Sequence, residues 1–208
     1  IMRVYFGIPL AIGYMQEIIF NEMYKVNPEE AQIWLYDFIE AIPEGADLEI
    51  VIYKVMFWLI NHKEYGIFNM VNGETKSVPN LDLPITGLSR IIGETIEGNI
   101  ASDAIWERVY DYFYKYDYQN ESERYVCMAM VCICESHRTD SRDGISKAIE
   151  WSISLDRLRR NVDISNLVFE LSKDVLTLLA DAPIVDPETL SPSSDEVSTN
   201  YSPNGGLE

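Results

Sequence analysis

The chain has 208 residues, 47% of them hydrophobic and 24% charged, a composition typical of a globular protein that can bury a sizeable core. Its 34 acidic and 16 basic residues give a formal net charge of −18. Such a charge repels nucleic-acid phosphates and anionic membranes, so it argues against nucleic-acid and membrane partners and favours a basic protein partner.

The apolar run at residues 4–15 is too short to span a bilayer, which takes about 18 residues or more. No small-residue cleavage site of a signal peptide follows it, so we interpret the run as part of the fold. The three cysteines are an odd number and cluster together, unlike the disulfide framework of a secreted protein. We therefore expect reduced thiols and a cytoplasmic location.

Apolar residues recur at helical spacing in eight segments. The clearest start combines a capping Asn27 with Pro28 in the first turn and Glu30 in capping-box spacing, and Asn120 opens a later segment in the same way. The predicted helices cover residues 14–26, 27–42, 48–61, 84–99, 102–118, 120–138, 142–160 and 163–182. The inward face of the second is expected to comprise Ala31, Trp34, Leu35, Phe38, Ile39 and Ile42. The last is expected to begin at a capping Asp163.

Between the third and fourth of these helices, Asn72-Gly73 separates two short runs, a pattern typical of a β-hairpin near residues 66–78. The predicted fold is therefore mainly α: a compact, irregular domain of seven or eight helices with this small hairpin. The rhythm of about twenty residues leaves an α-solenoid of helix pairs as the alternative. We expect one helical domain over residues 1–182. An acidic, Pro- and Ser-rich tail, 183–208, is expected to be disordered.

Cys127, Cys132, Cys134 and His137 fall within eleven residues and raise the question of a metal site. On a helix, Cys127 and Cys134 would stand roughly 10 Å apart along the axis, and Cys132 would point almost opposite to Cys134. Zinc needs four ligands at about 2.0–2.3 Å, and only Cys134 and His137 have a spacing that allows one ion between them. We therefore predict a buried apolar helix in which cysteine acts as a small hydrophobe, with no metal and no cofactor.

The segment Thr139–Glu150 partly matches a calcium-binding loop, with Gly144 at the turn position and Glu150 at the bidentate position. Thr139 replaces the first aspartate, however, and Lys147 occupies a ligand position. A simple connection between two helices is the preferred interpretation.

Tyrosine occupies every second position from Tyr110 to Tyr118. In a strand these side chains would line one face. The neighbouring helical segments favour a helix, in which several tyrosines face solvent, as suits a protein interface. The alternative is that they pack against neighbouring helices. The candidate partner-binding residues are Tyr110, Tyr114, Tyr118, Asp111 and Asp117.

Arg157, Arg159 and Arg160 form a dense basic cluster, for which pairing with acids of the protein is expected in preference to a phosphate site. The sequence contains no phosphate-binding glycine loop, nucleophile elbow or paired His-Glu helix motif. No catalytic residue can be assigned from it.

The function expected from these observations is a non-enzymatic acidic protein-binding domain that engages a basic protein, as an inhibitor, an immunity-type protein or an adaptor. One alternative is an enzyme or small-ligand-binding helical protein that uses Asp or Glu in a pocket between helices. Another is a structural subunit that forms homo-oligomers. A deep pocket would favour the former alternative and a broad apolar patch the latter.

Overall fold

The computed structural model describes residues 8–72, 81–137 and 143–185, so most of the predicted tail lies outside the described residues. Within these ranges the chain is mainly α-helical, with nine helices and no strand. Eight of them lie where the sequence predicts a helix. The nine helices are α2 (Leu10–Tyr24), α3 (Pro28–Glu40), α4 (Leu48–Asn61), α5 (Ile67–Asn72), α6 (Asp82–Ile96), α7 (Asp103–Tyr114), α8 (Glu121–Ser136), α9 (Gly144–Arg160) and α10 (Leu167–Ala180), of which α5 was not predicted.

The amino-terminal ends of the helices follow local capping chemistry. The side chains of Asn27 and Asn120 accept backbone N–H bonds from the residues three positions on, at 3.2 and 3.0 Å, as predicted. The predicted cap at Asp163 is wrong, because α10 begins four residues later. There the hydroxyl of Ser165 accepts the N–H of Leu167 at 3.1 Å and satisfies one of the free donors of the first turn.

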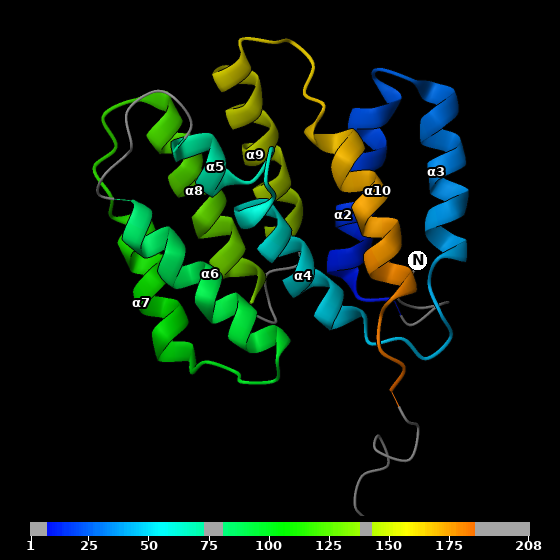
Figure 1. The fold of residues 1–208 in the computed structure, drawn as a ribbon, viewed down its shortest axis with the longest axis horizontal. Coiled ribbons are helices and arrows are strands. Elements are labelled where there is room, and N and C mark those ends of the chain that lie inside the picture. Colours follow the sequence, from blue (N-terminus) through cyan, green and yellow to red (C-terminus); the bar gives the residue numbers. More distant parts are fainter. Residues whose placement is uncertain (1–7, 73–80, 138–142, 186–208) are drawn as a thin grey trace, which may run out of the picture.

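The helices pack as one compact assembly in which α8 and α9 are central neighbours (Figure 1). Helix α7 packs on α8, α2 packs on α9, and α3 lies against α2 at the other end of the long axis. Helix α4 contacts both α6 and α10. After α10 the chain returns to the α3–α4 connection, where the N–H of Asp47 donates to the carbonyl of Pro183 at 2.8 Å.

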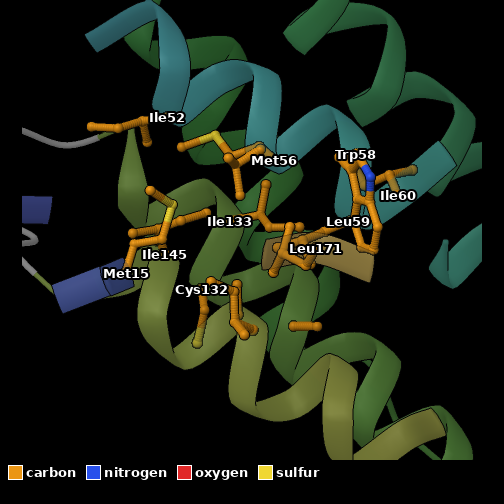
Figure 2. Packing of buried hydrophobic residues seen from close by; sticks show 14 of the residues in the cluster. Met15, Ile52, Met56, Trp58, Leu59, Ile60, Cys132, Ile133, Ile145 and Leu171 are labelled. Carbon is orange, nitrogen blue, oxygen red and sulfur yellow. The ribbon is translucent and has the colours of Figure 1, made fainter. Parts of the chain in front are cut away.

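The buried apolar side chains form one contiguous cluster drawn from all the long helices. Figure 2 shows Ile133 of α8 among side chains of other helices, including Met56 and Leu59 of α4 and Leu171 of α10. Helix α8 is buried over nearly all of its length from residue 126 to 134. A helix that is apolar on every side is expected at the centre of a fold, and α8 holds that place.

The predicted hairpin is wrong in its first half, because Ile67–Asn72 is the helix α5. Ile67 and Met70, one helical turn apart, are both buried, and the N–H of Met70 donates to the carbonyl of Gly66 at 2.9 Å. Asn followed by Gly is common at helix ends as well as in hairpin turns, which is why the sequence signal was misleading. The rest of the predicted hairpin, residues 73–78, lies outside the described residues.

The inward face predicted for α3 is partly wrong. Ala31, Trp34 and Phe38 are buried, but Ile39 is 53% exposed. Helix α3 is an outer helix, which packs chiefly on α2 and more lightly on α10, so only a narrow stripe of it is covered. The apolar residues of α3 therefore cover a wider face of the helix than its neighbours bury.

Candidate functional site

The cysteine cluster is part of the core, as predicted from its spacing. Cys127, Cys132 and Cys134 are all buried as free thiols in α8, and Figure 2 shows Cys132 in the packed interior. Burial raises the pKa of Cys127 and of Cys132 to about 12, and it raises the pKa of Cys134 as well. Within the described residues, no three His, Cys, Asp or Glu side chains gather closely enough to hold a metal ion.

These thiols are expected to resist modification in the folded protein. At a pH of about 8, thiols with such high pKa values carry almost no thiolate, and the thiolate is the reactive form. A disulfide reagent such as dithionitrobenzoate should therefore react on the order of a hundredfold more slowly with the native protein than with the protein in urea, where all three thiols should react. Rapid modification of even one thiol under native conditions would contradict the buried assignment.

The partial calcium pattern does not form a loop in its second half. Gly144 begins α9, and Glu150 lies well inside that helix. Asp143 binds Lys147 at 2.7 Å, an ion pair of adjacent helical turns. The preferred interpretation of a connection into a helix is therefore correct from residue 143 onward.

Helix α7 carries most of the tyrosine row and is helical, as expected, as far as Tyr114. It buries Trp106 and Phe113 against α8, and Val109 and Tyr110 are half-buried against the core, so the other side chains of the helix face solvent. Tyr114 is 66% exposed, and its ring stacks on that of Tyr110 with centroids 5.5 Å apart. Tyr118, just beyond the helix, is 47% exposed.

The carboxylates predicted beside these tyrosines are also at the surface. Asp111 is exposed and pairs with Lys115 at 2.6 Å, and Asp117 is exposed. We call this region the tyrosine surface; it comprises Tyr110, Tyr112, Tyr114, Tyr118, Asp111 and Asp117. Four of the five predicted partner-binding residues, Asp111, Tyr114, Asp117 and Tyr118, are exposed, whereas Tyr110 is half-buried against the core. Helix α7 lies at one end of the molecule (Figure 1).

A second surface of similar chemistry was missed by the sequence reasoning. On α3, at the opposite end of the molecule, Ile33 is 63% and Tyr36 is 71% exposed. The helix carries four acidic residues and no basic one. We call it the α3 surface; its exposed members are Glu29, Glu30, Ile33, Tyr36, Asp37, Ile39 and Glu40. The acidic side chains on one face of the helix are the sequence signal that could have found it.

His137 lies in a polar link between three helices. Its Nδ1 is 2.8 Å from the hydroxyl of Tyr53 in α4, its Nε2 lies 3.6 Å from Asp103 in α7, and its ring stacks on Trp106. Burial lowers the pKa of His137, although Asp103 opposes the shift, and burial together with Glu49 raises the pKa of Tyr53. The lowered pKa of His137 and the raised pKa of Tyr53 favour a structural hydrogen bond between a neutral imidazole and a protonated phenol.

Arg157 and Arg160 of the basic cluster pair with acids of the protein, as predicted. Arg157 binds Glu22 of α2 at 2.8 Å, and Arg160 binds Asp156 at 2.6 Å. Their positive charge is therefore engaged within the fold.

A pocket of about 560 Å³ lies between α4, α6 and α10. On α4 it is lined by Phe57 and Trp58, and the indole N–H of Trp58 donates to Asp174 of α10 at 2.6 Å. A Cβ added at Gly93 of α6 would lie 3.6 Å from the Phe57 ring, so these two residues are close neighbours in the pocket wall. The sequence reasoning named such a pocket as an alternative but could not place it.

Comparison with protein-family models, with curated proteins and with solved structures gave no match. Of the helices in residues 8–72, 81–137 and 143–185, none is both long and apolar enough to cross a membrane.

Proposed function

We propose that the chain is a non-enzymatic acidic domain that binds a basic protein through the tyrosine surface. The observation that carries this proposal is the exposure of Tyr114 and Tyr118 beside the carboxylates of Asp111 and Asp117. Tyrosine offers a large apolar contact area and a hydroxyl group at low entropic cost, and it is enriched among the residues that dominate binding energies.

The charge supports a basic partner. A net charge of −18 steers positively charged proteins toward the chain and speeds their association. The same charge disfavours self-association, because two copies of the chain repel each other. A heteromeric contact is therefore favoured over a homo-oligomer, and the buried, unpaired thiols are compatible with the reducing conditions of a cytoplasm.

The test is capture of partners from an extract of the source cells on the immobilised protein, followed by measurement of the dissociation constant for the captured protein. The double variant Tyr114→Ser and Tyr118→Ser should weaken binding by about thirtyfold, since two exposed aromatic anchors are removed. Raising the salt concentration from about 50 to about 500 mM should weaken the wild-type complex strongly, because salt screens the attraction.

The matched control is the double variant Ile33→Ser and Tyr36→Ser on the α3 surface, which should leave the affinity unchanged. Equal binding by the tyrosine variant and the wild type would overturn the assigned surface. If only the α3 variant lost binding, the contact would have to be moved to the other end of the molecule. An affinity that does not change with salt would argue against a basic partner.

A further inference from the structure

The pocket between α4, α6 and α10 has the size and lining of a small-molecule site. Its volume of about 560 Å³ lies within the range of about 300–1,000 Å³ that holds small ligands. Phe57, Trp58, Ile96 and Leu178 give it apolar walls. An apolar ligand body would therefore be well accommodated there.

The contacts between α4 and α6 set the positions of the charged groups. The side chain of Asn61 bonds Ser89 at 2.8 Å, and Phe57 lies beside Gly93, so the two helices run in opposite directions. In this antiparallel arrangement, each turn toward the start of α4 lies opposite the next turn toward the end of α6. Lys54, one turn before Phe57, therefore lies near the level of Glu97, one turn after Gly93. Both residues line the pocket, but they form no ion pair within 4 Å in the part of the chain that the structure describes.

The charges of the pocket favour a cation. Asp174 and Glu97 contribute two carboxylates against the single ammonium of Lys54, in a protein of net charge −18. Neither carboxylate is paired with a basic side chain among the described residues. Asp174 is half-buried and fixed by the Trp58 N–H, whereas Glu97 is exposed and screened by water, so Asp174 is the stronger counter-ion. Aromatic rings such as those of Trp58 and Phe57 also attract cations.

We propose that this pocket binds a small organic amine, with its ammonium group beside Asp174 and its apolar body against Phe57, Trp58 and Leu178. Lys54, which also lines the pocket, disfavours a second positive charge in the ligand, so a monoamine fits better than a diamine. The inference does not depend on the proposed protein contact, which lies on a different helix.

The test compares three probes of nearly the same shape: 4-phenylbutylamine, 4-phenylbutanol and 4-phenylbutyrate. Binding is measured by calorimetry and by the NMR shift of the Trp58 indole N–H. The amine should bind at least about tenfold more tightly than the alcohol, and the acid more weakly than either. Equal affinity for amine and alcohol, no binding of the amine, or shifts that spare Trp58 would overturn the proposal.

Variants that change charge alone separate the electrostatic contribution from the apolar one. Asp174→Asn keeps an oxygen to accept the Trp58 N–H. It should weaken the binding of the amine by about fivefold to tenfold and leave the binding of the alcohol unchanged. Lys54→Met should strengthen the binding of the amine, because it removes a positive charge from the pocket. Glu94→Gln, a charge change on α6 outside the pocket lining, should have no effect. An amine affinity that is the same in Asp174→Asn and the wild type would overturn the assignment of the counter-ion.

Discussion

Replacement of Gly66 by alanine is expected to lower the free energy of unfolding by about 3 kcal/mol, the upper end of the range for overpacking. The added Cβ would stand 2.4 and 2.5 Å from the backbone N and O of His62 and 2.7 Å from the carbonyl oxygen of Ile60. All three atoms belong to the backbone, so no side-chain rotation relieves the clash. The carboxyl end of α4 would have to move away from the start of α5.

Two other glycines give the matched control. Gly13 in α2 and Gly87 in α6 have no atom within 4 Å of the position of an added Cβ. Alanine at either position should raise the free energy of unfolding by about 0.5–1 kcal/mol, because alanine loses less entropy than glycine in a helix. Urea denaturation followed by circular dichroism measures all three changes. A Gly66→Ala protein as stable as the wild type would show that the close approach of α4 to α5 is not as described.

The helices were predictable because each is specified by its own sequence. A capping side chain, a first-turn proline and apolar residues at three-and-four spacing act within one segment, and they placed α3 and α8 to within a few residues. The burial of the cysteines followed from the same local argument. The prediction for α5 was wrong for the opposite reason. Its six residues are too few to show a helical period, so the prediction depended on the Asn-Gly pair alone.

The tyrosine surface could be predicted from the sequence and the pocket could not, again because one depends on local sequence and the other on packing between helices. The tyrosine surface lies on neighbouring residues of α7 and of the segment that follows it, so the sequence could name it once residues 103–114 were taken to be helical. The pocket takes Trp58 from α4, Gly93 from α6 and Asp174 from α10, which lie far apart along the chain. Only the packing of three helices brings them together, and no local pattern records that packing. The exposure of Ile39 likewise depends on how few neighbours α3 has, which its own residues do not encode.

Asp156 should contribute as much to stability as any polar side chain of the described chain, although its sequence context does not single it out. Its side chain is completely buried in α9. One carboxylate oxygen accepts from Arg160 at 2.6 Å, and the other accepts from the hydroxyl of Ser165 at 2.6 Å. Ser165 in turn accepts the N–H of Leu167, so the carboxylate connects the end of α9 to the start of α10.

Asp156→Ala is therefore expected to lower the free energy of unfolding by about 3 kcal/mol, since two hydrogen bonds to a charged acceptor are lost and the Ser165 hydroxyl is left buried without its acceptor. Asp156→Asn, which keeps the shape and one acceptor, should lose about 1–2 kcal/mol. The matched control is Asp111→Ala, which removes the same charge from an exposed pair with Lys115 and should cost less than about 0.5 kcal/mol. Urea denaturation of the three variants decides the matter. Similar losses for Asp156→Ala and Asp111→Ala would mean that the buried carboxylate does not hold the two helices together. The change of net charge alone cannot produce such losses, because removing one negative charge from a chain of net charge −18 relieves repulsion.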